Sequence, residues 1–274
     1  MMTHLRTITI ERDNPDAKLG VFPFSVPVVR ALSELTLDVP VTFFVGENGS
    51  GKSTVLEAIA AAAGLPTVGS LSVTDDATLG EQRKLAGALR LEWRRKTHRG
   101  FFLRAEDFFG FTKALSRERA ELLQRTREID EEYRDRPGAK GLAMMPIGRS
   151  LADMERRYGV NLDANSHGES FLKLFQSRLV PDGLYLLDEP EAPLSPQSQL
   201  ALLAMIHDMI ERDCQFVIAT HSPIVLAYPG ARIYSFDGGC IEQVEYERLE
   251  HVALTRDFLN DPGRFLRYLT RPEE

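Results

Sequence analysis

A glycine-rich stretch near residue 50 holds the residues best suited to chemistry. Residues 46–53 read Gly-Glu-Asn-Gly-Ser-Gly-Lys-Ser and satisfy the pattern G-x-x-x-x-G-K-[ST]. The apolar run Val41–Val45 predicts a buried strand before it, and Ser53–Ala63 predicts a helix after it. Between a strand and a helix, glycines let backbone N–H groups turn inward around phosphates, and the helix N-terminus adds partial positive charge. The stretch is therefore a candidate P-loop; the alternative, a chance glycine turn before a lysine, is disfavoured by the flanking elements.

The side chains of this loop suit different parts of a nucleotide. Lys52 would reach the β- and γ-phosphates of ATP, and the Ser53 hydroxyl would ligate Mg²⁺. The remaining candidate ATP contacts come from the loop and the first helical turn: Gly46, Glu47, Asn48, Gly49, Ser50, Gly51 and Thr54.

A second chemical feature is the pair of acids, Asp188 and Glu189, that ends the apolar run Leu184–Leu187. A doubly wound sheet presents its ligand site at the carboxyl ends of its strands, so both acids should emerge beside the P-loop. Asp188 would hold Mg²⁺ directly or through water, and Glu189 would orient and deprotonate the attacking water. Alone, such a pair is more often a loop start or a helix cap; the P-loop reverses that preference.

Asp188-Glu189-Pro190 resembles the Asp-Glu-Pro of ABC-type ATPases, the superfamily of transporter engines and SMC-like repair and chromosome ATPases. Three more segments match family motifs in the family's order. Residues 166–169, Ser-His-Gly-Glu, resemble the Ser-Gly-Gly-Gln signature that opens a helix, and 192–196 occupy the D-loop position. His221 follows the predicted strand 216–219, where the family has its switch histidine. The variant motifs are similar to those of stand-alone bacterial "AAA family" ATPases.

The resemblance implies Mg-dependent ATP binding and hydrolysis, with Ser166 and Gly168 contacting the γ-phosphate held by an opposite subunit. It also places His221 at the γ-phosphate as a catalytic residue beside Glu189 and Lys52. Because Lys52 and Ser166 would serve the same ATP only across two subunits, the expected active form is an ATP-sandwich homodimer.

This sequence departs from the transporter pattern at several positions. His167 and Glu169 replace a glycine and a glutamine of the signature, and the D-loop lacks its usual aspartate. At the position of the metal-sensing Q-loop glutamine, Glu106 is the candidate substitute; the alternative is a solvated acid at a helix start. These differences leave the details of interface coupling open.

The expected architecture is α/β: a P-loop NTPase of ABC-ATPase type with a mostly parallel core sheet, an antiparallel β-subdomain and a helical lobe. We expect one domain over residues 1–274, with a core lobe at about 1–106 and 180–274 and a helical signature lobe at about 107–179. Within that lobe, 113–136 is rich in Arg and Glu, with Leu115, Leu122 and Ile129 spaced by seven, which predicts a long helix.

Composition constrains the setting. The chain has 274 residues, 43% hydrophobic and 27% charged, as is ordinary for a folded soluble protein. Its net charge of −7 argues against a surface devoted to nucleic acid. No apolar run is long enough for a membrane span, and two cysteines without a signal peptide favour a cytoplasmic location.

One basic cluster could still meet a nucleic acid. Residues 94–99 carry four fixed positive charges, and residues 94–100 are the expected tip of a hairpin between strands at 89–93 and 101–104. Such a tip could contact phosphate backbones, although a solvated hairpin tip is the more ordinary interpretation.

Three biological classes fit these motifs. The first is a soluble stand-alone ATPase that acts on an unidentified protein or nucleic-acid partner. The second is the ATP-binding subunit of a membrane transporter, which the atypical signature and Q-loop disfavour. The third is an SMC-like DNA-repair head; the insert at 113–165 is short for its coiled-coil arms, and the chain has no Cys-x-x-Cys hook.

Overall fold

The computed structural model describes residues 3–12, 20–68, 80–158 and 167–267. The described chain is an α/β fold with two sheets, as predicted. The larger sheet has the order β5-β6-β7-β3-β8-β9, parallel except for β9. Its strands are β3 (Val41–Val45), β5 (Gly100–Arg104), β6 (Leu184–Asp188), β7 (Gln215–Ala219), β8 (Arg232–Ser235) and β9 (Glu242–Val244). The smaller, antiparallel sheet has the order β2-β1-β4: β1 (Leu5–Ile10), β2 (Glu34–Thr36) and β4 (Leu89–Trp93).

Strands β3, β6 and β7 of the larger sheet are buried on both faces, which explains why their sequences are almost entirely apolar. In β6, Tyr185 and Leu187 point into one core, whereas Leu184 and Leu186 point into the other. Successive side chains of a strand alternate between the two faces of its sheet. The sheet is therefore the middle layer of three.

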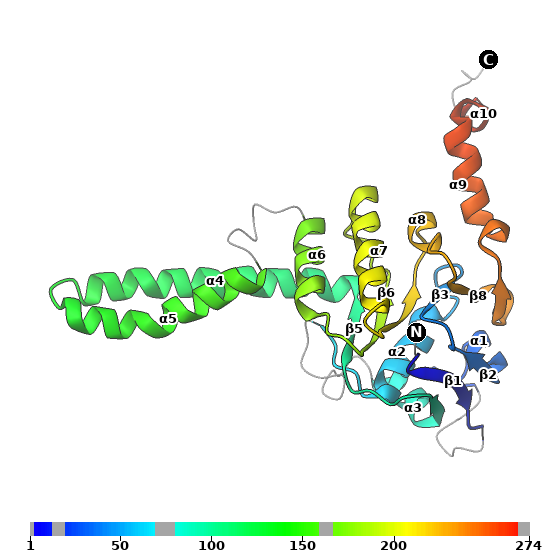
Figure 1. The fold of residues 1–274 in the computed structure, drawn as a ribbon, viewed down its shortest axis with the longest axis horizontal. Coiled ribbons are helices and arrows are strands. Elements are labelled where there is room, and N and C mark those ends of the chain that lie inside the picture. Colours follow the sequence, from blue (N-terminus) through cyan, green and yellow to red (C-terminus); the bar gives the residue numbers. More distant parts are fainter. Residues whose placement is uncertain (1–2, 13–19, 69–79, 159–166, 268–274) are drawn as a thin grey trace.

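Helices and the small sheet supply the outer layers (Figure 1). One face of the sheet packs against α6, α7 and α8, and the other against α1, α2, α3 and the small sheet. The bounds are α1 (Pro27–Ala31), α2 (Lys52–Ala63), α3 (Gly80–Ala88), α6 (His167–Arg178), α7 (Pro196–Ile210) and α8 (Pro223–Leu226). Helix α2 ends at Gly64, which has the left-handed conformation (φ 67°) that favours glycine after a helix.

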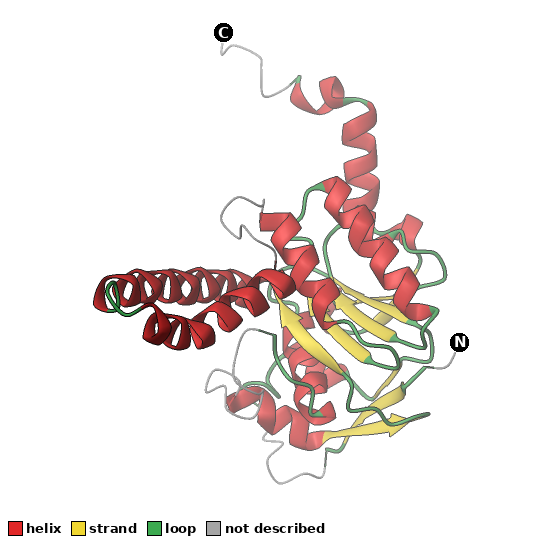
Figure 2. Ribbon diagram, turned by 60° about the vertical axis from the view of Figure 1, so that its left-hand side comes forward, coloured by secondary structure: helices red, strands yellow, loops and turns green. Residues whose placement is uncertain are grey.

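Two long helices, α4 (Ala105–Glu132) and α5 (Pro137–Tyr158), form an antiparallel hairpin that projects from the body (Figures 1 and 2). The helix predicted over 113–136 is present but begins earlier, directly after β5. Of the seven-spaced apolar residues, Ile129 is buried and Leu122 is half-buried, whereas the side chain of Leu115 lies outside what the structure describes.

The last elements are the turns η2 (Asp237–Gly239) and η3 (Tyr246–Arg248) and the helices α9 (Glu250–Asn260) and α10 (Pro262–Leu266). Helix α9 is anchored through buried Leu249 and Val252 and then leads away from the body (Figure 2). Among the described residues, no helix has the length and apolar character needed to cross a bilayer.

The predicted hairpin around the basic cluster is wrong. Its two strands belong to different sheets: β4 pairs with β1, and β5 pairs with β6. The connecting residues cross between the sheets, and the Arg95 guanidinium forms an ion pair with Asp182. Local sequence could not separate these strands, because a strand pattern does not identify its pairing partner.

Candidate nucleotide site

The P-loop joins the end of β3 to the start of α2, as predicted. Gly46, Gly49 and Gly51 have positive φ values of 143°, 83° and 101°, which favour glycine. At Gly51 a Cβ would also lie 2.6 Å from Cγ2 of Val28 and 2.8 Å from Cγ1 of Val26. The start of α1, through Val26 and Val28, therefore packs directly against the loop at Gly51. Gly51 is also the N-cap of α2 and has no side chain with which to cap the helix, so the N–H donors of the first turn remain available to an anion.

Lys52 lies across this loop. Its Nζ donates to the carbonyl oxygens of Gly46 (2.5 Å) and Glu47 (3.0 Å), and the residue is 4% exposed. Burial lowers the pKa of the Lys52 ammonium, while nearby carboxylates oppose that shift; these are Glu189, Asp188, Asp237 and Glu191. A positive charge thus stands where the loop can cradle phosphates.

Asp188, the last residue of β6, is brought beside the start of α2. Strand β7 separates β6 from β3, so the carboxyl ends of the three strands lie at one edge. The Asp188 side chain forms a hydrogen bond with Ser53, and its Oδ1 is buried with no hydrogen-bond partner among the described residues. Desolvation raises the pKa of Asp188 to about 6; the Ser53 hydrogen bond opposes this shift, and the charge of Glu189 adds to it. An unpartnered carboxylate oxygen beside a hydroxyl suits a hard cation such as Mg²⁺.

Glu189 begins the turn after β6 in the left-handed region, with φ of 50°. A non-glycine residue in this region is held there by its surroundings, and such residues cluster at functional sites. Here the Glu189 N–H donates to the Ala219 carbonyl at 2.9 Å, which ties the turn to β7. The Glu189 Oε1 lies 3.7 Å from Nε2 of His221. The structure thus brings the two candidate catalytic residues Glu189 and His221 side by side.

The other predicted residues fall as follows. Glu47, Asn48 and Gly49 form the exposed rim of the loop, while Ser50 and Thr54 are half-buried. Gly168 lies in the first turn of α6, where an added Cβ would be 3.1 Å from the Pro193 carbonyl oxygen. Ser166 lies outside the described residues. Glu106 is in the first turn of α4, and nothing of its side chain is described.

Three residues at this edge were not singled out from the sequence. Asp237 Oδ1 accepts the Glu47 N–H at 2.8 Å and so fixes the loop rim. Glu191 Oε1 accepts the His221 N–H at 2.8 Å. Arg104, at the end of β5 and in register with Asp188, is 7% exposed and forms an ion pair with Glu57 of α2 at 3.0 Å. Arg104 could have been found from the sequence, because it is a charged residue at the end of an apolar strand. Asp237 and Glu191 could not, because their contacts join segments that are far apart in the sequence.

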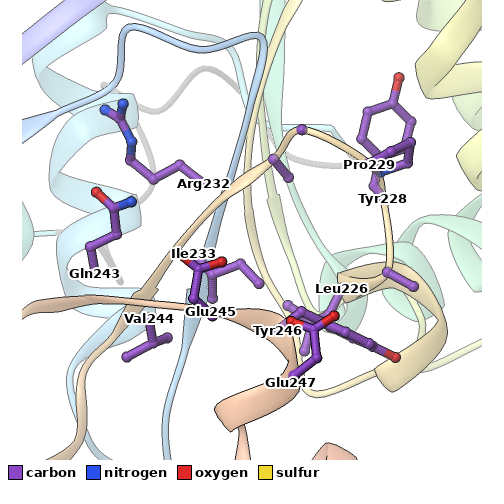
Figure 3. A pocket seen from close by; sticks show the side chains of 13 residues that line it. Leu226, Tyr228, Pro229, Arg232, Ile233, Gln243, Val244, Glu245, Tyr246 and Glu247 are labelled. Carbon is purple, nitrogen blue, oxygen red and sulfur yellow. The ribbon is translucent and has the colours of Figure 1, made fainter.

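A separate pocket lies elsewhere (Figure 3). It is lined from α8, the start of β8, β9 and η3, including Tyr228, Arg232 and Tyr246. The P-loop adjoins the opposite end of β8, since Phe236 donates to the Val45 carbonyl. The pocket is therefore distinct from the nucleotide site.

Two sequence-family models match the chain. One, described as an AAA domain, matches residues 24–143. The other, described as an AAA domain and as a candidate AbiEii toxin of a type IV TA system, matches residues 128–227. The first span contains the P-loop, and the second contains Asp188, Glu189 and His221. No curated protein matches the sequence.

Several solved structures are similar at low identity. The ATP-binding cassette MJ1267 of an ABC transporter, in its ADP conformation, is 17% identical, covers 99% of this chain and 100% of its own, and has a TM-score of 0.44. The SMC head domain from Thermotoga maritima is 14% identical, with coverages of 89% and 100% and a TM-score of 0.43. The protein cbiO1 from Clostridium perfringens, part of the ABC transporter complex cbiONQ, is 17% identical. The match covers 86% of this chain and 92% of cbiO1, with a TM-score of 0.43.

The family matches and the site geometry agree in where they locate the chemistry. Both AAA-domain spans include residues that meet at the carboxyl ends of β3, β6 and β7. A glycine-rich loop between a strand and a helix, with an acid at the end of a nearby parallel strand, is the arrangement of P-loop proteins. The chain therefore has the site arrangement of a P-loop protein, and two of its segments match models of AAA domains.

Proposed function

We propose that this protein binds Mg-ATP at the P-loop and hydrolyses it between Glu189 and His221. The observation that carries the proposal is the convergence of Lys52, the Ser53–Asp188 pair and the Glu189–His221 pair at one edge of the sheet. Positive charge for phosphates, oxygen ligands for a cation and a base for water are the parts that phosphoryl transfer requires.

The binding part rests on the loop. Its backbone N–H groups and the N-terminus of α2 would hold the α- and β-phosphates, and Lys52 would exchange its carbonyl acceptors for phosphate oxygens. Ser53 and Asp188 would hold Mg²⁺, with Glu106 as a further candidate ligand. The bound ion would neutralise charge on the β- and γ-phosphate oxygens.

The chemical part rests on Glu189. Its carboxylate is 46% exposed, so an attacking water can reach it, and it would take the proton from that water. His221 Nε2 has no hydrogen-bond partner among the described residues and would face the γ-phosphate. Catalysis would then come mostly from positioning and charge stabilisation.

We further propose one ATPase domain that works as an ATP-sandwich homodimer in the cytoplasm and couples hydrolysis to an unidentified partner. Ser166 and Gly168 of one subunit would complete the site of the other. The position of Gly168 beside the Pro193 carbonyl supports a shared surface, because it puts the start of α6 next to the segment 192–196. Each anion–helix contact contributes up to ~2 kcal/mol when partly buried, so trapped ATP should favour the dimer.

The test of the shared site is complementation. Ser166→Arg and Lys52→Ala should each be inactive, but a mixed dimer can rebuild one intact site from the Lys52 and Ser166 that the two variants retain. We expect partial ATPase activity to return on mixing. If the mixture stays inactive although the wild type hydrolyses ATP, the shared site is wrong and only the single-subunit proposal survives.

A further inference from the structure

The loops that follow β6 and β7 lie side by side at the nucleotide site. They are joined first through the backbone, by the Glu189 N–H to the Ala219 carbonyl. Two side chains from beyond β6 then reach the loop 220–222. Glu191 Oε1 accepts the His221 N–H at 2.8 Å, and Gln199 Oε1 accepts the Ser222 hydroxyl at 2.6 Å. The loop that carries His221 is thus held from the side of β6.

Glu191 is itself held by the turn that fixes Glu189. The Ala192 N–H donates to the Glu189 carbonyl at 3.0 Å, and the Leu194 N–H donates to the Glu191 carbonyl at 2.8 Å. The turn from Glu189 to Glu191 and the hydrogen bond from the His221 N–H to Glu191 therefore fix the position of His221 relative to Glu189. Their side chains face each other at 3.7 Å.

The Glu191 carboxylate is an unusual choice for a purely structural tie. Its Oε2 is buried and has no hydrogen-bond partner among the described residues, and a buried acceptor without a partner is destabilising. Its charge also faces the nucleotide site, because it acts on Lys52 together with Asp188, Glu189 and Asp237. Features that oppose stability and persist at such a site are expected to serve its chemistry.

We propose that Glu191 is a positioning residue that holds the His221 backbone, so that the imidazole and the Glu189 carboxylate are aligned for hydrolysis. This inference rests on the proposed ATPase function. The hydrogen bonds that hold the loop 220–222 also involve the segment 192–196, since Gln199 Nε2 donates to the Leu194 carbonyl at 3.2 Å. A displacement of that segment would therefore also displace His221.

The test of this proposal uses substitutions that change either the length or the charge of the Glu191 side chain. Glu191→Gln keeps an oxygen acceptor at the same distance and loses the charge. Glu191→Asp keeps the charge but is one methylene shorter. We expect kcat for ATP to fall ~10- to 100-fold in Glu191→Asp and Glu191→Ala, as for other residues that orient a reacting group, with KM nearly unchanged. Glu191→Gln keeps an acceptor for the His221 N–H but loses the charge, so it should lose less kcat than either of these variants, and the exposed control Glu247→Ala should stay close to the wild type.

Two further measurements exclude a merely structural role. Amide hydrogen exchange at His221 in the nucleotide-free protein should quicken in Glu191→Asp and Glu191→Ala, but not in Glu191→Gln. On a His221→Ala background, Glu191→Ala should lower kcat no further, because both changes remove the same function.

The opposite results overturn the inference. These are unchanged exchange at His221, equal loss of kcat in Glu191→Gln and Glu191→Asp, or additive losses with His221→Ala. A wild type that hydrolyses no ATP would instead overturn the proposed function. The exchange measurement would then still decide whether Glu191 holds the His221 backbone.

Discussion

Asp188→Asn should stabilise the nucleotide-free protein at neutral pH, because the carboxylate that it replaces is held at the site against a desolvation penalty. Asp188 is 8% exposed, and its pKa is raised from 3.8 to about 6, chiefly by burial. A rise of about two pKa units corresponds to about 3 kcal/mol of penalty on the ionised form.

The direction of the pH dependence follows from proton binding. Between about pH 4 and pH 6, the folded protein keeps a proton on Asp188 that the unfolded chain has lost. The free energy of unfolding therefore falls as pH rises through this window, and the full penalty is present above about pH 7. Asparagine does not titrate, so the stability difference should grow by about 1.4 kcal/mol in favour of Asp188→Asn between about pH 5 and pH 8.

Urea unfolding of both proteins, without nucleotide and with a chelator, measures this difference at each pH. Asp208→Asn is the matched control: it makes the same carboxylate-to-amide change at an exposed side chain of α7 and leaves the buried Asp188 carboxylate in place. The difference measured for this control is the reference for the change seen with Asp188→Asn. A difference for Asp188→Asn that is constant with pH, or that grows in favour of the wild type, would refute the argument from burial.

Two other substitutions test the scaffold. Gly51→Ala should abolish nucleotide binding and lower stability by at least ~1–2 kcal/mol, because the new Cβ meets Val28 in a left-handed backbone; Gly64→Ala, with positive φ but open space, should keep binding, and equal damage from both would contradict the packing argument. Leu186→Ala, fully buried in β6, should lower the free energy of unfolding by ~2–5 kcal/mol in urea titrations; a loss below ~1 kcal/mol would mean that this core is less tightly packed than described.

The sequence predicted the elements that carry the P-loop and the acids because their signals are local. Val41–Val45 and Leu184–Asp188 are short apolar runs buried on both faces, and glycines 46, 49 and 51 occupy backbone conformations that favour glycine. The order of the family motifs assigns Glu189 and His221 to one site, and their side chains lie 3.7 Å apart in the structure.

What the sequence could not supply depends on pairing between distant segments. The strands predicted at 89–93 and 101–104 looked like a hairpin, but the strands found there, β4 and β5, pair with β1 and β6 instead. The contact of Glu191 with the His221 N–H spans 30 residues and has no local pattern. The Arg104–Glu57 pair likewise joins β5 to α2 only after the sheet has formed.

The central claim is tested most directly by measuring ATP binding and phosphate release side by side for the wild type, Lys52→Ala and Glu189→Gln. Lys52 lies across the glycine-rich loop proposed to hold the phosphates, whereas Glu189 is half-exposed beside His221, so binding and turnover should separate. We expect the wild type to bind and hydrolyse Mg-ATP, Lys52→Ala to lose binding, and Glu189→Gln to bind ATP without releasing phosphate. Full phosphate release by Glu189→Gln, or undiminished ATP binding by Lys52→Ala, would contradict the account.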